Sequence, residues 1–258
     1  ERGPLEAGFN SGCWTSMMVQ QVIAKQFNVN YNYFYVSQLL KQLGFSYQKA
    51  KFVSDHLNEE AREKWLNETW PQIYKEAKAK GIPILFGDEA TCAMWGSLGR
   101  TWARKGEQPL VKTSGKRKGY KIFGLLDYFS GQLYTQAIRG KFNSKTYIEF
   151  LEQVLERTTG NLIVIQDGAR YHTSKECRAF FDNYKKRLTV HQLPSYSPDF
   201  NPIEHFWKKL KERATHNQYF ETFEELVKKV DHALVHFASM PSELVSLMKR
   251  YCNMGVSV

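Results

Sequence analysis

The sequence predicts a mixed α/β protein that follows a small all-helical segment. Between residues 15 and 44, the apolar positions recur at helical spacing. From Ile82 onward, short apolar runs with strand character alternate with amphipathic helices in the order β-β-β-α-β-α-β-α. This order is typical of a sheet that begins with an antiparallel hairpin and continues with β-α-β units. With 42% hydrophobic residues among 258, the chain can bury a substantial core.

The first fifty residues favour two short helices. Apolar stripes run over 15–27 and 36–43, the polar turn 28–30 lies between them, and Gly44 stands where a C-cap glycine belongs. Two helices joined by a tight turn resemble a helix-turn-helix, although a generic helical hairpin fits the same pattern. The basic run 46–51 is expected to be a linker.

A third helical segment precedes the first strand. Residues 58–80 are rich in Glu, Lys, Ala and Trp, and Asn58 is a suitable N-cap. Pro71 should kink or split this helix because proline lacks a backbone donor, and Gly81 should end it.

The remaining elements follow from apolar runs and their spacing. The run 82–86 predicts the first strand, which stops at Gly87 just before Asp88. Short strands are expected at 101–103 and 110–111, and a hairpin at 120–126 and 132–138. The later elements are a helix at 143–157, a strand at 162–165, a helix at 174–184, a strand at 188–193, and helices from Pro202 and over 223–237. The apolar face of the helix at 143–157 is formed by Tyr147, Phe150, Leu151, Val154 and Leu155.

The positive charge is concentrated in one segment. The chain has a net charge of +10, and eight basic residues face one acid, Glu107, between Arg100 and Lys121. Such a density favours a surface that binds phosphate backbone, although a solubilising hairpin would have the same composition. The eight are Arg100, Arg104, Lys105, Lys112, Lys116, Arg117, Lys118 and Lys121.

Several classes of protein are disfavoured by composition. The four cysteines form no CxxC pair, which argues against a structural zinc site and a disulfide framework and suits a reducing compartment. No apolar stretch is long enough to span a membrane, and no signal-peptide pattern is present. Because the chain begins with Glu1 rather than Met, we expect it to be a fragment of a longer protein.

Two predicted strands run directly into an aspartate, Asp88 and Asp167. Ligand sites in open α/β sheets gather at the carboxyl ends of strands, so neighbouring strands would bring these carboxylates face to face. A divalent cation relieves such repulsion, and oxygen ligands suit magnesium or manganese rather than zinc. The alternative is that each aspartate caps a loop or the following helix.

A third carboxylate lies at a predicted helix start. Asn201, Pro202 and Glu204 fit the N-cap, N1 and N3 positions of a capping box, which alone would explain the glutamate. The same place also holds a carboxylate on a rigid first turn, where a metal ligand can be positioned accurately.

Four runs together resemble the catalytic core of mariner-superfamily transposases, in particular their bacterial insertion-sequence branch. The runs are ILFGDEATCAMW, KIFGLLDYFSGQLY, LIVIQDGARYHTS and LPSYSPDFNPIEHFWKKLK, and the resemblance covers roughly residues 82–237. The SPDFNPIE run with Trp207 is the most specific piece. The resemblance implies a ribonuclease-H-like mixed sheet flanked by helices, with a catalytic, metal-binding triad at Asp88, Asp167 and Glu204. The last two are 37 positions apart, close to the mid-thirties spacing usual in the family.

The family implies a DNA transposase. It would bind terminal inverted repeats, cut at the element ends and join the 3′-OH ends to target DNA by phosphoryl transfer, with two Mg²⁺ or Mn²⁺ ions per site. Insertion at TA dinucleotides is usual in the family. Residues 1–57 would form a helix-turn-helix domain with its linker, the second of two such domains in a truncated chain, and residues 58–258 the catalytic domain. A homodimer without membrane contact, in the bacterial cytoplasm and associated with the nucleoid, is expected.

Further residues match the family pattern beside the triad. Arg170 and His172 follow the second aspartate, where DNA phosphate contact or support of the site is expected, with purely structural roles as the alternative. Glu89 is not expected to be a primary ligand, and Trp207 is expected in the core. The basic segment between Arg100 and Lys121 would bind the DNA backbone.

Two other functions remain as alternatives. The first is another nuclease of the ribonuclease-H fold, such as a resolvase or ribonuclease H, which normally lacks an N-terminal helix-turn-helix. The second is a domesticated, non-catalytic DNA-binding protein. Such relics often lose a triad carboxylate, whereas all three are present in this sequence.

Overall fold

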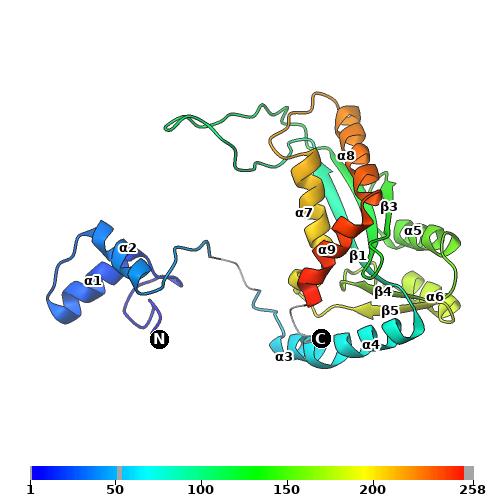
Figure 1. Ribbon diagram of the computed structural model, residues 1–258, viewed down its shortest axis with the longest axis horizontal. Coiled ribbons are helices and arrows are strands. Elements are labelled where there is room, and N and C mark those ends of the chain that lie inside the picture. Colours follow the sequence, from blue (N-terminus) through cyan, green and yellow to red (C-terminus); the bar gives the residue numbers. More distant parts are fainter. Residues whose placement is uncertain (1, 51–53, 253–258) are drawn as a thin grey trace. The chain divides into compact units, whose positions relative to one another are not determined.

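The computed structural model describes residues 2–50 and 54–252, and Figure 1 labels its helices and strands. The chain divides into two compact units, Glu1–Asp55 and His56–Val258. Lys51, the last residue of the predicted linker, lies outside the described residues.

The first unit contains the two predicted helices, α1 (Ser16–Phe27) and α2 (Tyr33–Gln42). The hydroxyl of Thr15 accepts a hydrogen bond from the Met18 N–H at 3.3 Å and so caps α1. Gly44 follows α2 with a φ of 86°, a conformation that favours glycine, as the sequence predicts. On α2 the side chain of Val36 is buried.

The second unit begins with a split helix. It consists of α3 (Glu59–Lys64), a π-helical turn η1 (Trp65–Thr69) and α4 (Trp70–Lys80). Asn58 caps the first part, and Gly81 ends the last with a φ of 64°. The predicted split is confirmed: because Pro71 has no N–H to donate, the backbone just before it adopts the wider π turn.

A mixed five-stranded sheet forms the centre of this unit, with the strand order β3-β2-β1-β4-β5 (Figure 1). β1, β2 and β3 pair antiparallel, and β1, β4 and β5 pair parallel. The bounds are β1 Ile84–Ala93, β2 Gly119–Asp127, β3 Leu133–Ile138, β4 Leu162–Gln166 and β5 Leu188–Gln192.

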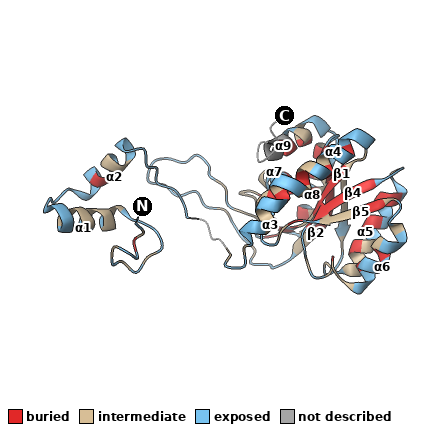
Figure 2. Ribbon diagram, turned by 90° about the horizontal axis from the view of Figure 1, so that it is seen from below, coloured by how far each residue is buried: buried red, intermediate tan, exposed pale blue. Residues whose placement is uncertain are grey.

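Helices cover both faces of the sheet. Successive residues of β1 alternate between two cores: Leu85 packs with α5 and α6, whereas Ile84 and Phe86 pack with α4, α7, α8 and α9. Figure 2 shows the buried strands β1 and β4 in red. As predicted, Trp207 is in the core, only 2% exposed. The helices and the 3-10 turn η2 are α5 Ser144–Glu156, α6 Lys175–Tyr184, η2 Pro198–Phe200, α7 Ile203–Ala214, α8 Phe223–Ala238 and α9 Pro241–Cys252.

Some predictions about strands and helices were wrong. β1 does not stop at Gly87 but continues to Ala93, because β2 pairs with it along its whole length. The strands expected at 101–103 and 110–111 are absent. That segment is exposed, Trp102 fully so, and forms no ladder that would hold a strand. The C-terminal helix α9 was not predicted.

None of the helices in the described part of the chain combines the length and the apolar character that a bilayer crossing needs.

Candidate active site

Asp88 and Asp167 occupy equivalent places on neighbouring strands. The parallel pairing of β1 with β4 ends at Phe86 and Ile165, and each aspartate lies two residues beyond that pair. The sequence left open whether these two strands are neighbours, and the structure shows that they are. Both carboxylates lie at the edge where the parallel strands end, which is the usual place for a site in such sheets.

Helix α7 brings Glu204 to the same edge. Glu204 lies in its first turn, and Trp207, one turn later, packs against β2 at Gly124. A Cβ added to Gly124 would lie 2.6 Å from the Trp207 ring, so only glycine allows the helix this close to the sheet. Gly124 is also the partner of Asp88 in the β1–β2 register, so α7 packs beside the first aspartate.

The predicted capping box at this helix start is wrong. α7 begins at Ile203, Pro202 occupies the N-cap position, and no side chain caps the helix. The Asn201 side chain instead donates a hydrogen bond from Nδ2 to the main-chain carbonyl of Gly87, at 2.9 Å. Glu204 is thus not engaged in a capping box, and its side chain is exposed at the rim of the site.

The carboxylates act on one another electrostatically. Burial raises the pKa of Asp88 to about 8. The negative charges of Glu204, Glu89 and Asp167 raise it in the same direction. Partial burial also raises the pKa of Glu204; Lys211 opposes this shift, and Asp167 and Glu89 add to it. The site therefore gathers carboxylates whose charges oppose one another, and Lys211 compensates the charge of Glu204 only in part.

A buried histidine joins the second aspartate to Glu89. The His172 ring is 2% exposed, with Nδ1 3.1 Å from Asp167 Oδ1 and Nε2 3.0 Å from Glu89 Oε1. The second contact has the distance of an ion pair without the direction of a regular hydrogen bond. Burial opposes a charged ring, but these two contacts raise the pKa of His172 to about 9. The same bond to His172 lowers the pKa of Asp167.

Two tyrosines complete this buried cluster. The Tyr171 hydroxyl donates to Glu89, and the Tyr147 hydroxyl donates to the side-chain oxygen of Gln166, directly before Asp167. The sequence patterns placed Tyr147 only in the apolar stripe of α5 and gave no role to Gln166. Because His172 is enclosed in this cluster, the DNA contact predicted for it is not supported, and support of Asp167 and Glu89 is the role that its position favours.

The donor set suits a hard divalent cation. Carboxylate oxygens are the ligands that magnesium and manganese prefer, and a cation would relieve the repulsion that raises the pKa of Asp88. As the side chains are placed, no group of three His, Cys, Asp or Glu within the described ranges could hold one ion. Ion binding therefore requires the carboxylates to turn toward one another, and Asp167, whose side chain is 55% exposed, has room to do so.

The basic segment is only partly tied to the rest of the unit. The Lys116 ammonium donates to the Glu221 carbonyl at 3.1 Å, and that of Lys121 to the Gly140 carbonyl. Lys118 lies 5.8 Å from the centre of the Phe223 ring. Arg170, beside the second aspartate, is exposed. The other five basic side chains of the segment are also exposed: Arg100, Arg104, Lys105, Lys112 and Arg117.

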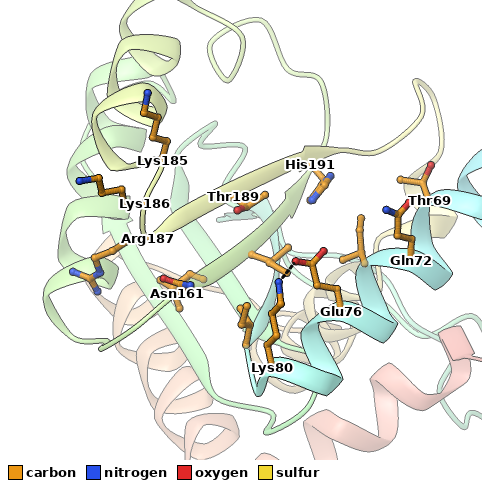
Figure 3. A pocket seen from close by; sticks show the side chains of 14 residues that line it. Thr69, Gln72, Glu76, Lys80, Asn161, Lys185, Lys186, Arg187, Thr189 and His191 are labelled. Carbon is orange, nitrogen blue, oxygen red and sulfur yellow. Dashed lines mark hydrogen bonds and ion pairs between the residues drawn. The ribbon is translucent and has the colours of Figure 1, made fainter.

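A pocket of about 270 Å³ lies away from the carboxylates, between α4 and β5 (Figure 3). Asn161, one of its lining residues, precedes β4, whereas Asp167 follows the other end of that strand. Inside the pocket, Lys80 is paired with Glu76 at 2.7 Å. Figure 3 shows the Lys185 and Lys186 side chains pointing away from this pair. The pocket is therefore not part of the acidic site.

Comparisons with known proteins cover both units. A family model described as DDE superfamily endonuclease matches residues 83–227, and one described as winged helix-turn helix matches residues 10–69. The chain is 26% identical over 169 residues to the insertion element IS630 uncharacterized 39 kDa protein of Shigella sonnei, a match that spans 65% of this chain and 49% of that protein. It is 28% identical over 190 residues to the transposable element Tc1 transposase of Caenorhabditis elegans, spanning 66% of this chain and 65% of that protein.

Among solved structures, the Mos1 mariner paired end complex with Mn is similar, with a TM-score of 0.66 and 19% identity, covering 100% of this chain and 80% of that one. At this level of identity the likeness concerns the fold. It confirms the expected ribonuclease-H-like sheet preceded by a helix-turn-helix.

Proposed function

The chain belongs to the DDE superfamily of endonucleases, within the mariner group of transposases, and we propose that it cuts DNA at the ends of a mobile element and joins the freed 3′ ends to target DNA. One observation carries this proposal: Asp88 and Asp167 lie at equivalent places on neighbouring parallel strands, and α7 brings Glu204 to the same edge. The mutual effect of these side chains on their pKa values supports it.

Asp88, Asp167 and Glu204 would hold the divalent ions, which we propose to be two Mg²⁺ or Mn²⁺. When bound, such ions activate the attacking oxygen and stabilise the leaving 3′ oxygen. The similar Mos1 complex was solved with Mn, which supports this choice of metal. Glu89 is held by Tyr171 and His172 and so serves as support rather than as a primary ligand.

The chain's other residues would orient these ligands and hold the DNA. His172 fixes the ring-facing oxygen of Asp167 while the rest of that carboxylate faces solvent, where a DNA strand would lie. The exposed arginines and lysines between Arg100 and Lys121, with Arg170, would bind phosphates. The N-terminal helices would recognise the terminal inverted repeats.

We propose that the two units of the chain have different functions. Residues 1–57 would recognise element ends, and residues 58–258 would carry out cleavage and joining. Because two element ends must be joined in one event, we propose a homodimer on DNA, associated with the bacterial nucleoid in the cytoplasm.

The test is the replacement of each carboxylate in turn. Asp88→Ala, Asp167→Ala and Glu204→Ala should each abolish cleavage of a labelled element end in Mn²⁺, while binding of the same duplex in a gel-shift assay stays near that of the unaltered chain. Glu176→Ala, which removes an exposed carboxylate on α6, is the control and should cleave normally. Substantial cleavage by any of the three variants would exclude that residue from the catalytic group.

A further inference from the structure

The turn that leads into α7 is tied to β1 by a single buried side chain. Asn201 is 4% exposed, and its Nδ2 donates to the carbonyl of Gly87 at 2.9 Å. Gly87 directly precedes Asp88, and it is the first residue of β1 beyond the parallel pairing with β4. The bond therefore joins two segments 114 positions apart, directly beside the first carboxylate.

The main chain of the same residue is bonded to the backbone of Glu204. The Glu204 N–H donates to the Asn201 carbonyl at 3.1 Å. Asn201 thus contacts β1 next to Asp88 through its side chain and the first turn of α7 through its backbone. Asn201 therefore links the residue before Asp88 to Glu204 through two hydrogen bonds, one from its side chain and one to its backbone.

The far end of the turn is fixed independently. Arg62 of α3 donates to Ser197 Oγ at 2.8 Å and forms a two-pronged ion pair with Asp199, with contacts of 3.2 and 2.8 Å. Its guanidinium also lies 4.1 Å from the centre of the Phe200 ring. With the start of the turn held this way and Trp207 packed on β2, the Asn201–Gly87 bond ties the end of the turn directly to β1 beside Asp88.

Only one end of the Asn201 amide has a hydrogen-bond partner. The Oδ1 atom of Asn201 is buried and has no hydrogen-bond partner among the described residues. A buried polar atom without a partner costs stability, and the side chain does not cap the helix. An apolar side chain of similar size would remove that unpaired oxygen but would take the Asn201 donor away from the buried Gly87 carbonyl, so the amide is explained by the bond that its Nδ2 makes.

We propose that Asn201 is a positioning residue that sets the spacing between Asp88 and Glu204 and thereby the affinity of the site for divalent cations. This inference rests on the function proposed above. Side chains that orient the ligands of a metal commonly change metal affinity about 10- to 100-fold when they are removed.

The experiment measures Mn²⁺ binding to the full DNA-free chain, with free Mn²⁺ followed by electron paramagnetic resonance. Asn201→Ala is expected to weaken binding about tenfold or more. Tyr120→Phe is the matched control: it removes the 2.7 Å hydrogen bond from Tyr120 to Asp231, which ties α8 to β2 away from the carboxylates. It should lose stability without a change in Mn²⁺ affinity.

The outcomes separate this inference from the proposed function. If Asp88→Ala binds Mn²⁺ as tightly as the unaltered chain, the acidic site does not hold the metal and the proposed function fails. If Asp88→Ala loses binding but Asn201→Ala keeps it, only the positioning role is overturned. Should Asn201→Ala not fold, Asn201→Ser, which leaves a polar side chain too short to reach Gly87, is measured instead, with the same result expected and unchanged affinity again overturning the inference.

Discussion

Asp88 lies in surroundings that oppose its own ionisation. The unfolded carboxyl has a pKa of 3.8, and burial with the nearby carboxylates raises it to about 8 in the folded chain. A group whose pKa is raised on folding contributes stability that is fully present below its unfolded pKa and is lost as the pH rises through its folded pKa. At neutral pH, Asp88 therefore lowers the free energy of unfolding unless a bound cation compensates its charge.

Asp88→Asn should accordingly stabilise the protein in the presence of EDTA. The gain should be small near pH 4, grow with pH and level off above about pH 8. Because one pKa unit corresponds to about 1.4 kcal/mol, relief of part of this shift should raise the free energy of unfolding by on the order of 2 kcal/mol at pH 8. Thermal melts at several pH values measure it.

The control for this experiment is Asp182→Asn, which neutralises an exposed aspartate on α6. It should melt close to the unaltered chain at every pH. If Asp88→Asn melts no higher than the unaltered chain at pH 8, Asp88 is not in the environment that the structure gives it. Added Mn²⁺ should stabilise the unaltered chain more than the variant, because the variant has one ligand fewer.

Among the elements, the segment between β1 and β2 differs most from its prediction. The two short strands expected there are absent, and the chain instead exposes a basic loop whose Trp102 is fully and Leu110 91% exposed. The sheet end of the segment is anchored through Lys116, Lys118 and Lys121. The basic side chains earlier in the loop are exposed to solvent. The exposed charges are the ones that the proposed contact with DNA phosphates would use.

Replacing Arg104, Lys105 and Lys112 with glutamine should weaken DNA binding and reduce its salt dependence. Each DNA phosphate that the protein no longer neutralises lowers the slope of log K against log salt by roughly 0.9, so the slope should fall by up to about 2.7. Fluorescence anisotropy at several salt concentrations measures this slope. The same change at Lys185, Lys228 and Lys229, three exposed lysines on other elements, is the comparison and should have a smaller effect. Equal slopes for the two triple variants would mean that the loop makes no DNA backbone contacts of its own.

At the scale of the whole molecule, the two units should be separable in function. The second unit has its own sheet and cores, whereas α1 and α2, which we propose to recognise the element ends, are in the first. The match to the winged helix-turn helix model extends to residue 69, so it includes α3 of the second unit.

A chain that begins at Asn58 should therefore lose its preference for inverted repeats while still binding Mn²⁺ and nicking DNA weakly. Specific recognition contributes several kcal/mol over nonspecific binding, so the loss should be clear in competition between repeat-bearing and scrambled duplexes. The full chain, measured in parallel, supplies the reference preference. Discrimination retained by the short chain would place sequence recognition in the catalytic unit.

The sequence by itself determined the kinds of element, their order and the carboxylates to consider. The five apolar residues expected on the inner face of α5 are the five that the structure buries: Tyr147, Phe150, Leu151, Val154 and Leu155. Helix caps such as Asn58 and the ending glycines were also predictable, because each depends on neighbours within a few positions. From the sequence, Asp88 and Asp167 would meet only if their strands were neighbours, and their catalytic role stays a prediction.

The tertiary structure alone decided the features that depend on distant partners. β1 passes through Asp88 because β2 pairs with it to Ala93, and a strand's end is set by its neighbour rather than by its own residues. Asn201 has the composition of a local helix cap, but its Nδ2 donates to a carbonyl 114 positions away and its Oδ1 caps no N–H of α7. His172 likewise bridges Asp167 and Glu89 only because the sheet brings β1 beside β4. Local spacing cannot encode such choices, since the free energy that decides them comes from groups that meet only after the chain has folded.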